Sequence, residues 1–402
     1  MQHQKILLWG ILIGALAGAF CGWFFGSDMQ AVAWIGQFFL QALKMLIIPL
    51  IIAAVISGIA SIGDVRKMGK LGGFTILYYL CTTAAAVLIG LVVVNIFQPG
   101  VGVSTLEKDV TGSMLAEEAR GFGDIILTLV DPSLVQAAAD LNLLPIIIFC
   151  IFFGAALSTV GEQGTTLIRF FEGLNEVMMK LVIWVMYLAP VGVFALIASQ
   201  LGAAGGGAAF WQEIAAVGWY VLTVILGLGI HFLVLFLVLF LMTGRGRQYL
   251  VTMLRALVTA FGTASSSATL PLTMECATEA GVDKRSVRFV LPVGATVNMD
   301  GTALYEAVAV MFIAQAYGIS MGIEQQAIIF VTATLAAIGA AGIPQAGLVT
   351  MLIVLSAVNL PAEGISLLLA VDWFLDRFRT SVNVWGDSVG AAVVEKLFLK
   401  TE

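Results

Sequence analysis

The chain has 402 residues, of which 60% are hydrophobic and only 11% are charged. Soluble domains carry about 25% charged residues, so a mean hydropathy of +1.03 excludes an ordinary soluble protein and predicts a polytopic membrane protein. The net charge of -6 is small and dispersed, which indicates no nucleic-acid partner. The four cysteines and two histidines show no zinc-ligand spacing.

Apolar runs long enough to span a bilayer begin near the N-terminus. Residues 6–25 have no A-x-A cleavage pattern after them, so we interpret them as a transmembrane helix and not as a signal peptide. Further spans are expected at 33–60, 72–98, 124–160, 165–196 and 214–243. Pro132, Asp140 and Pro145 interrupt the 124–160 span, which therefore predicts several short helical pieces.

Two later segments, 247–277 and 326–357, have a different pattern. Each is apolar and is broken at its middle by small residues and a proline, around 263–271 and 338–347. Neither half is long enough to span the membrane at about 1.5 Å per residue. Two broken segments in corresponding positions indicate a transporter built from inverted repeats, and each segment predicts a re-entrant helical hairpin. Broken backbone at that depth is tolerated only against protein or a water-filled cavity.

The segment 287–316, between the two hairpins, contains the sequence NMDGT at 298–302. We expect Gly301, in the middle of a helix, to weaken the hydrogen-bond ladder and free carbonyl groups for a cation. Glu306 follows on the same helix. Because a carboxyl group in apolar surroundings resists ionisation, Glu306 is either a proton carrier or a fixed partner of a basic side chain such as Arg377.

The segment 370–394 is unusually polar for its position in a hydrophobic chain. Placed on a helix, five of its polar side chains share an arc of about 80°: Asp372, Asp376, Arg379, Asn383 and Asp387. A charge at the bilayer centre costs about 2.5–3.5 kcal/mol on insertion scales. A structural ladder of ion pairs is one interpretation; we favour a helix that lines a site for charged ligands and cations.

The remaining polar groups permit several kinds of site. The serines at 265–267 suit an anion at a broken-helix N-terminus, or a small-residue helix contact. A serine nucleophile lacks a nearby histidine, which argues against an enzyme. The carboxylate and amide oxygens at 298, 300, 383 and 387 suit a sodium-like cation, or a polar clasp between helices.

The placement of basic residues predicts the topology. Most of the 19 lysine and arginine residues fall on one side if the spans cross alternately. The positive-inside rule then gives eight spanning helices with both termini cytoplasmic. The hairpin at 263–271 would enter from the cytoplasm and the hairpin at 338–347 from outside.

Four motifs occur in a fixed order along the chain: SSSATLP at 265–271, NMDGT at 298–302, AGIPQAG at 341–347, and DRFRT at 376–380 with Asn383 and Asp387 after it. Together they resemble the dicarboxylate/amino acid:cation symporter family, which includes archaeal aspartate transporters, bacterial glutamate symporters and animal excitatory amino acid transporters. The resemblance covers nearly the whole chain and is most specific from 260 to 395. It implies an all-α, elevator-type transporter that forms homotrimers.

The resemblance also implies substrate-binding roles. Arg379 would bind the side-chain carboxylate of the substrate with help from Thr302, and Asp376 would bind its amino group. The groups expected around the α-carboxylate are Asn383, Thr380, Ser265 and Ser266. Ile343 and Gly347 would close over the substrate. No residue is expected to be catalytic.

Three sodium sites follow from the same resemblance. The first would use Asp387, Asn383, Asn298 and the carbonyl of Gly294. The second would use Asp300, Asn298, Tyr79, Thr82 and Thr83. The third would use Thr296 and carbonyls near Ala337, Ile338 and Ala340. Glu306 would carry a proton.

The chain departs from the archaeal pattern at two places. Archaeal members carry an arginine where Ala264 stands, whereas the second arginine of this chain is Arg377, as in the animal members. Archaeal members also have glutamine at the position of Glu306. Both features predict coupling machinery of the animal type, although the short loops and the length are prokaryotic in character.

The resemblance assigns the domains as follows: scaffold helices at 1–70; a transport-domain helix at 71–98; a mainly scaffold and trimerisation region at 124–243, with its last helix on the transport domain; and the transport core at 247–402. We expect a secondary active symporter in the cell (inner) membrane that imports glutamate or aspartate with sodium and needs no cofactor. A proton-coupled glutamate or C4-dicarboxylate symporter and a passive anion channel are the alternatives.

Overall fold

The computed structural model describes residues 2–61, 65–102, 130–140, 143–203, 208–338 and 346–399, and no β-strand occurs among them. The expected all-helical architecture is therefore confirmed for this part of the chain. Its first half contains α1 (Gln2–Phe25), η1 (Gly26–Val32), α2 (Ala33–Ser61), α3 (Val65–Phe97), α5 (Leu134–Ala139), α6 (Leu143–Thr159), η2 (Gly161–Gly164), α7 (Thr165–Met186) and α8 (Ala189–Ala203). Its second half contains α9 (Ala208–Thr243), α10 (Arg247–Thr263), α11 (Ser266–Glu279), α12 (Lys284–Val297), α13 (Asp300–Ala316), α14 (Ile323–Ile338), α15 (Ala346–Ala357), η3 (Ala362–Ile365) and α16 (Ser366–Leu399).

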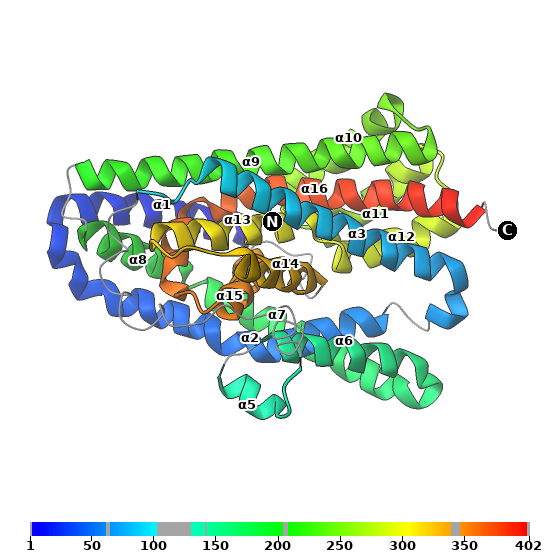
Figure 1. Cartoon of the computed structure of the whole chain (residues 1–402), viewed down its shortest axis with the longest axis horizontal. Helices are drawn as coiled ribbons and strands as arrows, with labels where there is room; N and C mark the ends of the chain where they lie inside the picture. The colour runs from blue at the N-terminus through cyan, green and yellow to red at the C-terminus, as the bar shows by residue number, and fades with distance from the viewer. Residues whose placement is uncertain are drawn as a thin grey trace.

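The helices pack in two groups. In the first group, α2 packs against α6, α7 and α8, and α8 packs against α1. In the second group, α16 contacts α9, α10, α12, α13 and α3, while α14 and α15 pack on each other and on α13. Figure 1 shows α9 and α10 along one edge of the molecule and α2 with α6 along the opposite edge, with α3 and α16 between them. Smaller contacts, such as α8 with α16 and α2 with α15, join the two groups.

Several helices are long and apolar enough to cross a membrane. Four stretches of the described residues meet that condition by length and composition, and a fifth is added if the bent pair α7 and α8 counts as one span. One of the four covers Trp9–Ala60, which is 52 residues long and contains both α1 and α2. Since about 20 residues cross the hydrocarbon core, this stretch is longer than one crossing requires.

The span expected at 165–196 is not one continuous helix. The structure has two helices there, α7 and α8, bent by 52° at a short break. Pro190 explains the break, because proline has no N–H to bond the carbonyl of Met186 and its ring clashes with that turn. By contrast, the expected short pieces within 124–160 are found as α5 and α6, while residues 124–129 and 141–142 lie outside the described residues.

The contact between α1 and α8 is a close approach of two backbones. Gly14, Gly18 and Gly22 recur every fourth residue of α1 and face α8. A Cβ atom added at Gly18 would lie 2.6 Å from the carbonyl oxygen of Phe194, and one added at Gly22 would lie 2.9 Å from that of Ala198. Small residues at such spacing allow two helix backbones to approach closely. Close packing matters in lipid because no hydrophobic effect draws the helices together.

This packing predicts that Gly18→Ala destabilises the protein. The added methyl group meets backbone and cannot be relieved by a rotamer change, so we expect a loss of about 1–3 kcal/mol, as for other overpacked sites. The matched control is Gly173→Ala on α7, where nothing lies within 4 Å of the added Cβ. Thermal unfolding of both variants in detergent measures the difference. Equal melting temperatures in the two variants would contradict the close contact.

Candidate functional site

The site is built on a break in the helical backbone between α12 and α13. Asn298 (φ -100°, ψ 89°) and Met299 (φ -112°, ψ 52°) are not helical, so α12 ends and α13 begins inside the protein. The expectation that Gly301 lies in mid-helix is therefore wrong, because Gly301 is the second residue of α13. Its small size instead permits contact with α16, since a Cβ there would lie 2.6 Å from the Arg379 carbonyl oxygen.

Asn383 on α16 satisfies backbone and side-chain groups at the start of α13. The backbone N–H of Gly301 donates to Asn383 Oδ1 at 2.7 Å, and Asn383 Nδ2 donates to Thr302 Oγ1 at 3.3 Å. Nδ2 also lies 3.2 Å from the sulfur of Met299. The first turn of α13 has N–H groups with no partner in its own helix, so this amide is one of the groups that stabilise the break.

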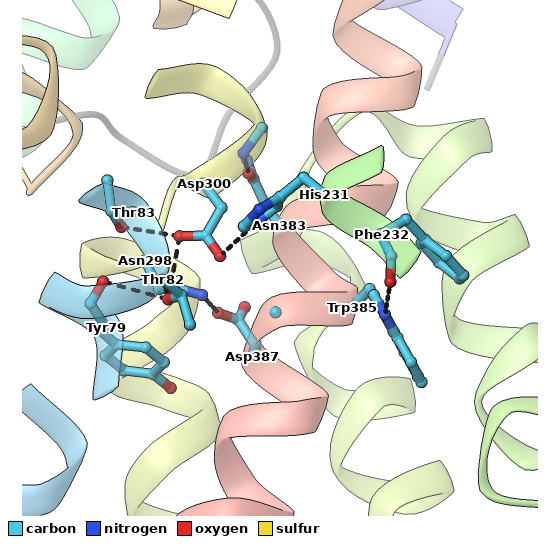
Figure 2. Close-up of polar contacts among 12 residues, drawn as sticks. Tyr79, Thr82, Thr83, His231, Phe232, Asn298, Asp300, Asn383, Trp385 and Asp387 are labelled. Carbon is cyan, nitrogen blue, oxygen red and sulfur yellow. Dashed lines mark hydrogen bonds and ion pairs between the residues drawn. The ribbon is translucent and has the colours of Figure 1, made fainter. Parts of the chain in front are cut away.

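The Asp300 carboxylate, at the first position of α13, collects donors from two other helices (Figure 2). From α3, Thr83 donates to Oδ1 at 2.8 Å and Thr82 approaches the same oxygen at 3.3 Å. From α9, His231 Nε2 lies 3.0 Å from Oδ2. Thr82 Oγ1 also lies 3.2 Å from the Tyr79 carbonyl oxygen and 3.4 Å from Asn298 Oδ1. The five oxygen-bearing residues expected around the second sodium ion thus come together.

A second carboxylate, that of Asp387 on α16, lies on the other side of Asn298. Asn298 Nδ2 donates to Asp387 Oδ1 at 3.0 Å, so one amide bridges the two acidic groups. Two glycines make room for this arrangement. A Cβ at Gly294 would clash with Asp387 Oδ1 and with the Tyr79 hydroxyl, and a Cβ at Gly386 would lie 2.9 Å from Asp300 Oδ2.

The charge balance of this cluster favours a cation. Asp300 and Asp387 are both buried, and within the described ranges neither forms an ion pair with lysine or arginine. Their partners are hydroxyl, amide and imidazole groups. A buried charge without a counter-ion is costly, and hard oxygen ligands suit hard cations. The described part of the chain contains no group of three His, Cys, Asp or Glu side chains of the kind that binds transition metals.

Arg379 on α16 forms the cationic part of the site. It is fully buried, and its Nη2 lies 2.8 Å from Asp376 Oδ1 and 2.9 Å from Asp372 Oδ1. The guanidinium also stacks 3.9 Å from the centre of the Tyr305 ring. Its Nε and Nη1 are buried and have no hydrogen-bond partner among the described residues. Since buried donors are almost always paired in proteins, these two nitrogens mark a place for an acceptor from a ligand.

The two helix pairs α10–α11 and α14–α15 lie beside this region, since α10 and α11 pack on α16 and α14 and α15 pack on α13. Ala264 adopts a left-handed conformation (φ 49°), and Ser265 caps α11 by accepting from the backbone N–H of Ala268 at 3.2 Å. Ser266, the first residue of α11, is buried. From the other hairpin, a Cβ at Gly347 would touch Arg379 Nη1 at 2.5 Å and Thr302 at 3.3 Å.

Other predicted residues are placed less centrally. Thr380 donates to the carbonyl of Asp376 in its own helix. Thr296 is exposed and donates to the carbonyl of Val293, so its hydroxyl faces its own helix. Ala337 and Ile338 end α14. Ala340, expected at the third sodium site, and Ile343, expected over the substrate, lie outside the described residues. Both roles stay predictions.

Glu306 is fully buried on α13. The alternative prediction, that Glu306 pairs with Arg377, is wrong. Arg377 instead donates from Nη1 to the carbonyls of Phe261 at 3.0 Å and Gly262 at 3.1 Å, at the end of α10. Burial acts most strongly on the Glu306 carboxyl group, and the Thr350 side chain on α15 and the charge of Arg379 act on it more weakly.

His231 is the residue of this cluster that sequence reasoning missed. It lies within an apolar helix of 36 residues and has no polar neighbour in sequence. The one sequence signal was a histidine inside a long apolar run, and the structure shows that it is buried. Asp372, by contrast, was expected on the polar face of α16, and it is found beside Arg379.

Comparison with known proteins identifies the family of this chain. The sodium:dicarboxylate symporter family matches residues 7–397 of the chain. The excitatory amino acid transporter 3 of Oryctolagus cuniculus is 40% identical over 444 residues, which cover 97% of this chain and 84% of the relative. The human excitatory amino acid transporter 3 is 41% identical over 421 residues, covering 92% and 79%. An excitatory amino acid transporter of Caenorhabditis elegans is 38% identical over 446 residues, covering 98% and 88%. The chain therefore belongs to the sodium:dicarboxylate symporter family and is a membrane transporter, not an enzyme.

Proposed function

We propose that this protein is a secondary active symporter that imports acidic amino acids, glutamate or aspartate, with sodium. The observation that carries the proposal is Arg379, whose Nε and Nη1 are buried without a partner among the described residues. A guanidinium forms short, charge-assisted hydrogen bonds with a carboxylate. The side-chain carboxylate of an acidic amino acid is the acceptor that fits this position.

The remaining groups around Arg379 account for the rest of the substrate. Asp376 lies within ion-pair distance of Arg379 and supplies a negative charge for the amino group. The N-terminus of α11, with Ser265 and Ser266, supplies N–H and hydroxyl donors for the α-carboxylate, since helix N-termini favour anions. Thr302, Thr380 and Asn383 complete this set, and Gly347 with Ile343 would cover it. The names of the relatives, all excitatory amino acid transporters, support the same substrate class.

The coupled ions would use the oxygen cluster on the other side of Asn383. We assign one sodium ion to Asp387, Asn383, Asn298 and the carbonyl of Gly294. A second belongs to Asp300, Asn298, Tyr79, Thr82 and Thr83. A third remains assigned to Thr296 and the carbonyls near Ala337, Ile338 and Ala340. Each ion would neutralise buried negative charge. Cation binding and substrate binding would therefore depend on each other.

The proposed mechanism is an elevator in a homotrimer of the cell (inner) membrane, with eight spanning helices, two re-entrant hairpins and both termini cytoplasmic. The scaffold would comprise 1–70 and most of 124–243, and the transport domain 71–98, the last helix of 124–243 and 247–402. The packing of α3 and α9 with α10–α16, and the smaller contacts of this group with α1, α2 and α6–α8, support that division.

Transport by reconstituted protein tests the proposal as a whole. In proteoliposomes with an inward sodium gradient, we expect labelled glutamate or aspartate to accumulate above equilibrium, and succinate, which lacks an amino group for Asp376, to compete poorly. Equilibration without accumulation would favour the anion channel. Full accumulation in sodium-free buffer under a pH gradient, or robust uptake of succinate alone, would favour the proton-coupled alternative.

The role of Arg379 predicts the effect of Arg379→Lys. Lysine keeps the charge but loses the planar fork. Loss of one or two charged hydrogen bonds, each worth about 1.5–3 kcal/mol, should reduce the transport efficiency for glutamate by about 100-fold or more. The control is Arg255→Lys, at an exposed arginine paired with Glu279 on the neighbouring helix. Undiminished glutamate uptake by Arg379→Lys would remove Arg379 from the substrate site.

The role of Glu306 as a proton carrier predicts a separation of two transport modes. Glu306→Gln cannot exchange a proton, so it should keep sodium-dependent exchange of substrate across the membrane but lose the pH dependence of net uptake. The matched control is Glu363→Gln, at an exposed carboxylate 3.6 Å from Lys44. Net uptake measured from about pH 5 to about pH 9, roughly two units either side of neutrality, decides the point. An unchanged pH profile in Glu306→Gln would leave Glu306 with a structural role only.

A further inference from the structure

We propose that His231 on α9 is a positioning residue for the cation site at Asp300. Its imidazole fixes the orientation of the carboxylate, so that Oδ1 stays directed at Thr82 and Thr83. The inference rests on the proposed sodium coupling and adds to it a residue on a helix that contributes no ligand of its own.

The contact itself is direct and buried. His231 Nε2 lies 3.0 Å from Asp300 Oδ2, and both side chains are 0% exposed. An ionised carboxylate only accepts hydrogen bonds. His231 Nε2 therefore carries a proton and donates a hydrogen bond to Asp300.

The geometry of Asp300 explains why a donor at Oδ2 matters. The χ2 angle of aspartate has a broad, roughly two-fold distribution, so the carboxylate plane is not fixed by the backbone. The two threonines of α3 both approach Oδ1. Only the histidine hydrogen-bonds Oδ2 within the described part of the chain. Without it, the plane is free to turn, and Oδ2 loses a hydrogen bond in a site closed to water.

The position of His231 is itself fixed by the packing of α9. Gly227, one turn earlier, lets α9 approach α13, since a Cβ there would lie 3.1 Å from Leu304. One residue later, the Phe232 ring stacks on Trp385 of α16 with centroids 5.1 Å apart, and Trp385 Nε1 donates to the Phe232 carbonyl at 3.2 Å. Figure 2 shows the hydrogen bond between Trp385 and Phe232 beside the contact of His231 with Asp300. The ring is thus held between the helix that carries Asp300 and the helix that carries Asp387.

The test measures sodium binding to the purified, full-length protein in the absence of substrate, by the sodium dependence of its melting temperature in nanodiscs. His231→Leu removes the donor. His231→Gln retains an N–H group at about the distance of Nε2. Thr223→Val is the control: this buried α9 residue, two turns before His231, donates only to the Trp219 carbonyl of its own helix.

Groups that orient a metal ligand typically contribute about 10- to 100-fold to metal affinity. We therefore expect half-saturation by sodium to rise at least about tenfold in His231→Leu. His231→Gln should recover most of that affinity, and Thr223→Val should match the unsubstituted protein. The sodium dependence of glutamate uptake should shift in parallel, while the melting temperature without sodium stays similar in His231→Gln and the unsubstituted protein.

Unchanged sodium affinity in His231→Leu would overturn the proposal. If His231→Leu does not fold, His231→Gln decides the question, with Asp300→Asn as the reference for a lost site. A sodium affinity as weak in His231→Gln as in Asp300→Asn would show that a donor at this position does not orient the carboxylate. A weakening of the same size in Thr223→Val would assign the effect to packing of α9 and would also overturn it. Absence of any sodium response in the unsubstituted protein would instead refute sodium coupling itself, and this inference with it.

Discussion

The burial of charge between α13 and α16 is the constraint on which the rest of the structure depends. Removing Arg379, Asp300 and Asp387 from water costs several kcal/mol for each ion after relaxation. The fold offsets part of this cost with short contacts: Arg379 to two aspartates, Asp300 to Thr82, Thr83 and His231, and Asp387 to the amide of Asn298. The part left uncompensated, two nitrogens on Arg379 and the excess negative charge around Asn298, corresponds to the ligands we propose.

The break at 298–299 makes that chemistry possible. In an unbroken helix each N–H and carbonyl group of these residues would bond a residue four positions away, and none would face the site. The break turns the end of α12 and the start of α13 into a polar surface in the interior. Irregular backbone at this depth is tolerated in membrane proteins where it lines a cavity or is covered by protein, and here α16, α3 and α9 cover it.

In our proposal the two halves of the site meet at Asn383. This amide binds the first turn of α13 on the side of the cation cluster and contacts Thr302 on the side of Arg379. A cation bound near Asp387 would therefore favour the α13 geometry that presents Thr302 to a substrate. The coupling of sodium to substrate in our proposal needs no long-range path, because the two sets of ligands share residues and one helix start.

Much of this was determined by the sequence alone. The all-helical membrane class, the two broken hairpins and the polar face of α16 follow from local hydrophobicity, small-residue breaks and the helical period, which need no knowledge of neighbours. Pro190, which separates α7 from α8, was also a local signal, and the long apolar run around it concealed it. Only the tertiary structure decided which polar groups meet. His231 reaches Asp300, and Arg377 turns to the end of α10 and not to Glu306. These partners are 69 and 115 or more residues apart in the chain, and helix packing, which periodicity does not encode, brings them together.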